Sequence, residues 1–498
     1  MNGDECRTVI PHASFGNTLC ATDNIPEGKV IIKERPLICV PAGMALTDGM
    51  NAVARETGCA TQCRRAQVFA QACNELRDGL LSLLHIPDVH ADELKDTDAA
   101  KACLSVASRA AQPLDISEHK LLQGLLAFAA NAHGYRGGEA LYETGSKLTH
   151  TCGPPNTRYI TTEDGFGCHT ALTDIPKGDV LTTTYIGKEH ALMSAPCRQR
   201  NIRNNFLFTC QCKSCKEEVD MYRGLPCPCC LPSSARTAEG QLIPELASIH
   251  AHLPGVVFFH PQRAATGKKP WVCSTCHEAF EDDARTLGMP FAEAGGDEGC
   301  RSSWPGIEEQ LEQQVIAHMA IIRRVPSKPP HLPAWKSLLH ECCSSLGPAH
   351  WAPHRMSLIT AECSAAKLEG MADLLPHIAS LPMGKDCCTE FINTLNEVQT
   401  CVEGTLGWLD SIPASPARRS TADLTCTPLW TIAAHLVQCA LKESLPQLLE
   451  DARCRMASLA QGCVSTSLGS HIYKGRHAGN DAILAAMADP SFCDLCRC

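Results

Sequence analysis

The sequence predicts an α+β protein of several domains, from three observations. Runs of β-branched residues separated by turn residues occupy residues 1–40 and return in residues 131–209. Apolar residues at helical spacing fill residues 41–130 between them and the chain from residue 301 to residue 498. Cysteines crowd together within residues 210–300. At 498 residues the chain is also too long for a single compact core.

Composition narrows the class of protein and its compartment. A hydrophobic content of 44% is typical of globular proteins, and no stretch reaches the roughly 20 apolar residues that a membrane span needs. No signal peptide is recognisable, so we expect no membrane association and a place in the cytoplasm and/or the nucleus. The net charge of −10 disfavours direct nucleic-acid binding. Because reducing compartments do not keep disulfides, the 32 cysteines are expected as free thiols and metal ligands.

The first β segment shares a turn motif with the second. ATDNIPEGKVI, residues 21–31, and ALTDIPKGDVL, residues 171–181, each place IPxGxV between two expected strands. Proline presets φ for such a turn, and glycine takes its strained corner. The two β segments are therefore predicted to form one domain that is interrupted by the helical insertion at residues 41–130.

Successive helices are expected from residue 301 onward. Trp335, Leu338, Leu339 and Cys342 make one helical stripe, and a second runs from Leu445 to Leu459. No strict internal period is present, so the pattern predicts an antiparallel helical bundle or a solenoid.

Two groups of cysteines have the spacing of metal ligands. FTCQCKSC supplies three thiolates that can converge on one tetrahedral zinc, and it lacks a fourth ligand, for which Cys152 is one candidate among the other thiols. PCPCC and WVCSTC supply the paired CxxC knuckles of a zinc ribbon, in which Cys229 competes with Cys230. The tail FCDLCRC lacks a fourth partner, which favours surface thiols over a third metal site. The ligand candidates are Cys210, Cys212, Cys215, Cys227, Cys230, Cys273 and Cys276.

The stretch LTHTCGPPN, residues 148–156, allows three interpretations. It can be a metal half-site, a His/Cys nucleophile pair, or a tight turn. The nucleophile pair is disfavoured because no glycine-rich oxyanion elbow follows Cys152.

Four motifs, in this order, resemble the SET-domain protein-lysine methyltransferases, and most closely their SET and MYND subgroup. GNTLCATDNIPEGKVIIKERPLI is similar to the opening SET strands, and GEALYETGSKLTHTCGPPN to the central motif. GDVLTTTYIG resembles the strand that ends in the active-site tyrosine, and RNIRNNFLFTCQCKSC the post-SET zinc segment. The resemblance implies a β-rich SET domain with a helical insertion, a post-SET zinc site, a zinc ribbon, and an all-α, TPR-like C-terminal domain.

The resemblance also implies a reaction and its cofactors. The methyl donor is S-adenosyl-L-methionine, the substrate is a protein lysine on a histone or another protein, and two structural Zn²⁺ ions are bound. Cys152 completes the first zinc site, and Tyr185 takes the catalytic position. We expect a monomer whose C-terminal helices can bind a protein partner. The implied donor pocket contains Asn17, Thr18, Leu19, Asn131, Ser146, Thr149, His150, Tyr185 and Phe208.

The chain departs from the family pattern at several points. Thr149 stands where the family has asparagine, Thr18 where it has a second glycine, and Phe206 where the subgroup usually has a second tyrosine. The CxxC pairs of the MYND zinc finger are not recognisable. These departures motivate an alternative function, a non-catalytic SET-fold scaffold that binds partners through its helical domain. Asn131 has the simpler interpretation of a helix cap, and Tyr185 that of a packed aromatic residue.

Overall fold

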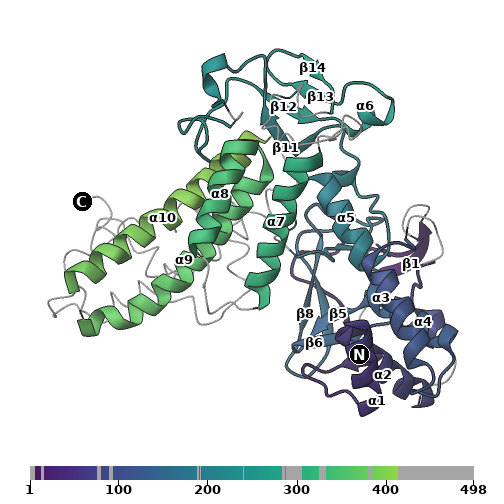
Figure 1. Ribbon diagram of the computed structural model, residues 1–498. Helices are drawn as coiled ribbons and strands as arrows, with labels where there is room; N and C mark the ends of the chain where they lie inside the picture. Colours follow the sequence, from purple (N-terminus) through teal and green to yellow (C-terminus); the bar gives the residue numbers. More distant parts are fainter. Residues whose placement is uncertain are drawn as a thin grey trace. The chain divides into compact units, whose positions relative to one another are not determined.

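The chain, coloured by residue number in Figure 1, divides into two compact units. Unit 1 is Met1–Gly187 with Ala195–Lys216, and unit 2 is Lys188–Ser194 with Glu217–Cys498. The computed structural model describes residues 6–12, 16–75, 80–88, 94–187, 190, 192–238, 241–282, 287, 305–324, 332–378 and 384–412. The predicted helical stripe at 445–459 and the cysteines of the tail lie outside these residues.

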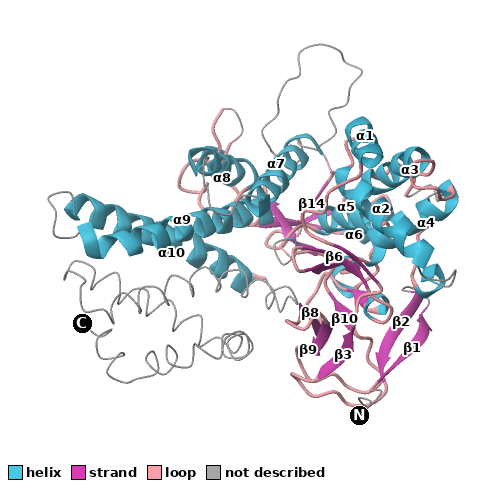
Figure 2. Ribbon diagram, turned by 90° about the horizontal axis from the view of Figure 1, so that it is seen from below, coloured by secondary structure: helices cyan, strands magenta, loops and turns pink. Residues whose placement is uncertain are grey.

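The described residues of unit 1 form four small sheets, and strands are magenta in Figure 2. The first is antiparallel and pairs β1 (Arg7–His12) with β2 (Gly16–Ala21). The second has the order β3 (Val30–Glu34), β9 (Gly167–Ala171), β8 (Thr157–Thr161), and the third β4 (Ile38–Val40), β6 (Gly138–Leu141), β5 (His133–Tyr135). In the fourth, β7 (Thr149–His150) runs parallel to β10 (Thr182–Thr183).

The two IPxGxV turns lie side by side, as the sequence predicts. Ile25 and Ile175 exchange backbone hydrogen bonds of 2.9 and 2.8 Å. Gly28 and Gly178 have φ values of +80° and +91°, a left-handed conformation that glycine adopts without steric cost. The pairing brings the strands before and after the insertion into one unit.

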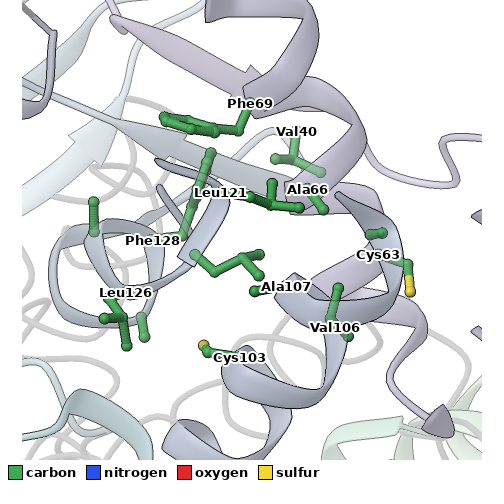
Figure 3. Close-up of a cluster of buried hydrophobic side chains, with 14 of the residues drawn as sticks. Val40, Cys63, Ala66, Phe69, Cys103, Val106, Ala107, Leu121, Leu126 and Phe128 are labelled. Carbon is green, nitrogen blue, oxygen red and sulfur yellow. The ribbon is translucent and has the colours of Figure 1, made fainter. Parts of the chain in front are cut away.

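The insertion between these strands is helical and has its own core. It contains α1 (Asp48–Thr57), α2 (Ala60–Glu75), α3 (Asp98–Ala110) and α4 (Glu118–Asn131), and hydroxyl N-caps begin α1, α3 and α4. Phe69 and Phe128 are buried there (Figure 3). The ring of Phe69 packs directly on Gly124, where an added Cβ would lie 2.4 Å from a ring carbon. The close helix contact therefore requires glycine. The fifth helix of unit 1, α5 (Ala195–Phe206), leads to the cysteines at 210–215.

Unit 2 combines a four-stranded antiparallel sheet with long helices. The sheet has the order β11 (Asp220–Pro226), β12 (Val256–Phe259), β13 (Trp271–Cys273), β14 (Ala279–Phe280), and the short α6 (Pro261–Ala265) joins β12 to β13. The long helices are α7 (Pro305–Arg324), α8 (Leu332–Leu346), α9 (Trp351–Ile378) and α10 (Gly384–Ser411), and α9 lies alongside α10 (Figures 1 and 2).

The helical stripe predicted on α8 is confirmed. Trp335, Leu338 and Cys342 are buried, and Leu339 packs against a neighbouring apolar cluster. The mixed α and β class is likewise confirmed, whereas the TPR-like arrangement and the domain boundaries stay predictions. Among the described helices, none is long and apolar enough to cross a membrane.

A buried ion pair joins the sheet of unit 2 to its helices. Arg223 on β11 donates two hydrogen bonds of 2.6 Å to the carboxylate of Glu308 on α7. The guanidinium also stacks over the rings of Phe259 and Trp271, at 4.4 and 4.7 Å. The charge is thus buried with both a counter-ion and aromatic faces, an arrangement that suits arginine and not lysine.

Candidate functional site

A cavity of about 150 Å³ lies in unit 1 at the end of α4. Residues 130–134 form one wall, and Ser146, Tyr159, residues 183–185 and Phe206 form the rest. Of the predicted donor-site residues, Asn131, Ser146 and Tyr185 line it. Among the described residues that line the cavity, none is Asp, Glu, Lys or Arg.

Tyr185 follows β10 and is held at both its backbone and its hydroxyl. Its hydroxyl donates a hydrogen bond of 2.6 Å to the carbonyl oxygen of Leu148, and its backbone N–H donates one of 3.0 Å to Nδ1 of His150. Burial raises the pKa of Tyr185, so the phenol is neutral at physiological pH. The lone pairs of a neutral phenol remain available to accept a hydrogen bond.

His150 connects Tyr185 to a group of cysteines. Because Nδ1 accepts a hydrogen bond from Tyr185, the ring proton lies on Nε2, which is 3.3 Å from Sγ of Cys152. Burial lowers the pKa of His150 to about 4, which keeps the ring neutral. The imidazole therefore donates to the sulfur and accepts from the tyrosine backbone at the same time.

The predicted post-SET ligands come together in space. Cys152, Cys210, Cys212 and Cys215, here called the Cys152 cluster, have all their sulfur atoms within 4.8 Å of one another. Four ligands about 2.3 Å from a tetrahedral zinc are about 3.8 Å apart. The sulfur of Cys152 lies 3.9 Å from that of Cys210 and 3.5 Å from that of Cys215. The geometry and the four thiols fit a structural zinc ion, and leave it no open coordination position.

The local hydrogen bonds also favour thiolates in the Cys152 cluster. The backbone N–H of Cys152 donates to Sγ of Cys212 at 3.4 Å, and that of Cys212 donates to Sγ of Cys210 at 3.4 Å. Hydrogen bonds from Cys152, Cys210 and Cys215 lower the pKa of Cys212, whereas the hydrogen bonds of Cys152 with the other three thiols raise the pKa of Cys152. Because a thiolate is the form that binds zinc, it is the two backbone N–H donors that favour metal binding, at Cys212 and Cys210.

The predicted zinc ribbon gives a second cluster. Cys227, Cys230, Cys273 and Cys276, here called the ribbon cluster, have sulfur atoms 3.7 Å apart in the pairs Cys227–Cys276 and Cys230–Cys273. These separations also fit tetrahedral zinc. Burial raises the pKa of the Cys273 thiol. Hydrogen bonds from the backbone N–H groups of Cys276 and Thr275 act in the opposite direction, and the resulting pKa is lowered to about 7. Cys229 is exposed and lies outside the cluster.

The other predicted donor-site residues lie apart from the described cavity lining. Thr18 and Thr149 are both buried, and their hydroxyl groups hydrogen-bond to each other. Two of the positions that depart from the family pattern, Thr18 and Thr149, are therefore direct partners. Leu19 is buried in a core cluster, and Asn17 is exposed. Phe208 packs against the rings of His150 and Tyr185, with centroids 6.0 Å away in both cases.

Asn131 is the last residue of α4, before the C-cap Ala132, and it lines the cavity. Its Nδ2 donates to the carbonyl oxygens of Ala127 and His85, at 2.7 and 2.8 Å. Both amide hydrogens are thus used, and Oδ1 is left as an acceptor.

Several lining residues were not expected from the sequence. His133, Tyr159, Thr183 and Thr184 belong to the cavity wall. His133 lies two residues beyond Asn131, and the two threonines directly precede Tyr185. Closeness in the sequence to a predicted site residue therefore indicates that these three residues can reach the cavity. Tyr159 carries no such signal, because only the sheet pairing of β8 brings it to the site.

A third group of side chains has metal-ligand chemistry but is already satisfied. Glu308, Glu312 and His350 lie together in unit 2. Both carboxylate oxygens of Glu308 accept from Arg223, and Oε1 of Glu312 accepts from Trp351 and Ser194, at 2.7 and 3.0 Å. This group is a buried hydrogen-bond network, and its oxygens are not free for a cation.

Comparisons with known proteins agree with the resemblance read from the motifs. Histone-lysine N-methyltransferase SET5 of Scheffersomyces stipitis is 39% identical over 82 residues, which is 16% of each chain. Protein-lysine N-trimethyltransferase SMYD5 of Homo sapiens is 33% identical over 84 residues, 17% of this chain and 20% of that protein. The chain thus spans only about a sixth to a fifth of these relatives. No protein-family model matches.

One solved structure covers nearly the whole chain at low similarity. "Crystal structure of the SET domain of LSMT bound to Lysine and AdoHcy" aligns with 98% of this chain and 95% of its own, at 8% identity and a TM-score of 0.29. That score is too low to indicate a shared fold. The local sequence matches to SET5 and SMYD5 therefore carry the similarity, and they confirm the predicted resemblance to SET-domain lysine methyltransferases.

Proposed function

We propose that this protein is an S-adenosyl-L-methionine-dependent protein-lysine N-methyltransferase. The observation that carries the proposal is the position of Tyr185. It lines a cavity whose described lining residues include no Asp, Glu, Lys or Arg, and its backbone is hydrogen-bonded to His150, which donates to the Cys152 cluster. The similarity to histone-lysine and protein-lysine methyltransferases supports the same reaction.

The cavity residues fit the amino-acid end of the donor. Both hydrogens of the Asn131 amide are already donated to backbone carbonyl groups, so the side chain can only accept, through Oδ1. Such an acceptor suits an amino group. Asn131 and Ser146 would hold the donor, and we propose that Thr18, Thr149, His150 and Phe208 also belong to its pocket. When bound, S-adenosyl-L-methionine supplies a methyl group attached to a sulfonium sulfur, and this methyl group is transferred to a neutral amine by direct in-line displacement.

The chain's own side chains orient the amine and keep water away. The neutral phenol of Tyr185 accepts a hydrogen bond from the lysine Nε, because its own proton is given to Leu148. Phe206 and Phe208 flank Tyr185 at 5.6 and 6.0 Å between ring centroids. Their apolar surface lowers the pKa of the lysine, which loses its proton to water before it attacks. Orientation then supplies much of the rate.

Zinc has a structural role in this proposal. The Cys152 cluster would hold one ion and the ribbon cluster a second, each with four cysteine ligands. In unit 1 the metal would fix Cys152, which in turn accepts from His150.

The substrate is proposed to be a protein that presents a lysine, on a histone or on another protein. We further propose that the enzyme works as a monomer in the cytoplasm and/or the nucleus, and that its C-terminal helices take a protein partner.

Purified protein incubated with labelled donor and core histones or cell extract tests the proposal. We expect label on lysine, and loss of most of the rate in Tyr185→Phe with unchanged folding. Calorimetric titration with S-adenosyl-L-methionine separates the enzyme from a scaffold: the enzyme binds at micromolar to tens of micromolar donor. Absence of both transfer and binding in folded, zinc-loaded protein contradicts the proposal.

A further inference from the structure

His133 lines the same cavity as Tyr185 but takes no part in the reaction described above. It is the first residue of β5 and lies two residues beyond the end of α4. Because it is fixed by the backbone of the helix end and the strand start, its place on the cavity wall follows from the fold.

One ring nitrogen of His133 is committed to the backbone. Nδ1 is 3.0 Å from the carbonyl oxygen of Asn131. A carbonyl oxygen only accepts, so Nδ1 carries the proton and Nε2 of the neutral ring carries a lone pair. Burial lowers the pKa of His133 to about 4, which keeps the ring in this neutral form at physiological pH.

The imidazole is also held in orientation by its neighbours. Its ring meets Tyr142 edge-on at 5.5 Å between centroids, Tyr159 at 4.9 Å and His169 at 5.5 Å. In the described part of the chain, Nδ1 makes the ring's hydrogen bond and Nε2 has no partner. The cavity lining therefore includes a residue whose oriented ring keeps one acceptor without a hydrogen bond.

We propose that Nε2 of His133 binds a primary amine in this cavity by accepting a hydrogen bond from it. The inference rests on the proposed function, under which the ε-amine of the incoming lysine is the amine, and it names His133 as a substrate-positioning residue beside Tyr185. The α-amino group of the donor has the same chemistry and is the other source.

The electrostatics of the cavity suit a neutral amine. No carboxylate lies among the described lining residues. A carboxylate would raise the pKa of the amine and stabilise the protonated form, which cannot attack a methyl group. An imidazole lone pair orients the amine by a hydrogen bond without adding a negative charge, so the nucleophilic form is retained.

The test compares two histidine variants of the full chain, loaded with zinc. His133→Phe keeps an aromatic ring in the cluster and removes Nε2. His169→Phe is the matched control, because His169 belongs to the same aromatic cluster, is buried, and is not part of the cavity lining. Thermal unfolding of both variants checks that the two substitutions disturb packing to a similar extent.

The first measurement is binding of n-butylamine, a small primary amine, followed by NMR. We expect His133→Phe to weaken binding about tenfold, equivalent to ~1.4 kcal/mol, and His169→Phe to leave it unchanged. This readout does not require methyl transfer, so it holds or fails separately from the proposed function. Equal butylamine affinity in the wild-type protein and in His133→Phe overturns the inference.

Two further arms identify the amine. Calorimetry measures the donor's Kd, and transfer to core histones measures KM and kcat. A loss confined to KM and kcat/KM assigns the hydrogen bond to the lysine, and a loss confined to the donor's Kd assigns it to the donor's amino group. Unchanged values in both arms overturn a role for His133 in either ligand.

Discussion

The two cysteine clusters have the same chemistry but are connected to different parts of the molecule. The Cys152 cluster draws its fourth ligand from a segment some sixty residues earlier, and that ligand accepts a hydrogen bond from His150, which also binds the backbone of Tyr185. The ribbon cluster uses two knuckles of one small sheet, the first directly after β11 and the second at the end of β13, and Arg223 of the Arg223–Glu308 ion pair lies on the same β11. The comparison teaches that two clusters with the same four ligands can have unequal consequences. Loss of the first should reach the cavity, and loss of the second should reach the helices of unit 2.

The largest expected effect comes from removing one ligand of each cluster. Under the proposed function, Cys152→Ser and Cys227→Ser should each reduce the zinc content from two ions to one. In Cys152→Ser we expect methyl transfer to fall by roughly 100-fold or more, since the residues that hydrogen-bond to metal ligands alone contribute about 10–100-fold to metal affinity or activity. In Cys227→Ser we expect a smaller loss of transfer and a lower unfolding temperature. Zinc content and initial rates measure the difference.

A second variant separates this connection from general unfolding. His150→Phe leaves all four thiols of the Cys152 cluster in place and removes both hydrogen bonds of the imidazole. Zinc affinity should fall about 10–100-fold. Equal losses of transfer in Cys152→Ser and Cys227→Ser, or wild-type zinc affinity in His150→Phe, would contradict the unequal roles.

The next largest effect concerns the surroundings of the ribbon cluster. Arg223→Met leaves Glu308 as a buried charge without its counter-ion, which should destabilise unit 2 by about 3–5 kcal/mol. The double variant Arg223→Met/Glu308→Gln should recover part of this loss, because it removes the unpaired charge. Chemical denaturation with fluorescence detection measures both. If the double variant is less stable than Arg223→Met, the buried-charge explanation is wrong.

The same ion pair predicts a dependence of stability on pH. Burial raises the pKa of the Glu308 carboxyl group, but Arg223 and His350 outweigh burial and lower this pKa from 4.5 to about 2. A lowered carboxyl pKa contributes stability that is complete above the unfolded value and is lost as pH falls from 4.5 toward 2. Glu308→Gln should lack this contribution, so the difference in unfolding free energy between wild type and variant should shrink across that window. A constant difference would contradict the assignment.

How much of this was predictable depends on whether the chemistry is local in the sequence. The ribbon cluster follows from CxxC spacing, and the paired IPxGxV turns follow from proline and glycine preferences, because each signal lies within a few residues. The fourth ligand of the Cys152 cluster required the family resemblance, since spacing alone left other thiols open. Tyr159 and the orientation of His133 depend on strand pairing and side-chain packing, which no local pattern encodes. The hydrogen bond between Thr18 and Thr149 is likewise not encoded by a local pattern, because the two residues lie 131 positions apart in the sequence.

The smallest expected effect tests that contact, on the strand that carries His150. The hydroxyls of Thr18 and Thr149 bond to each other in a buried setting, so removing one leaves the other without its partner. Thr18→Val and Thr149→Val should each cost about 1–3 kcal/mol, whereas the double variant should cost little more than either single change. The coupling energy from the double-mutant cycle is therefore expected to be about as large as one single-variant cost, about 1–3 kcal/mol. Thermal unfolding of the wild type, the two single variants and the double variant measures this coupling. If the costs of the two single changes simply add, the two threonines replace the family residues independently. Strong coupling would mean instead that the departure at Thr149 is accommodated by the one at Thr18, and that the strand leading to His150 and Cys152 keeps its position for that reason.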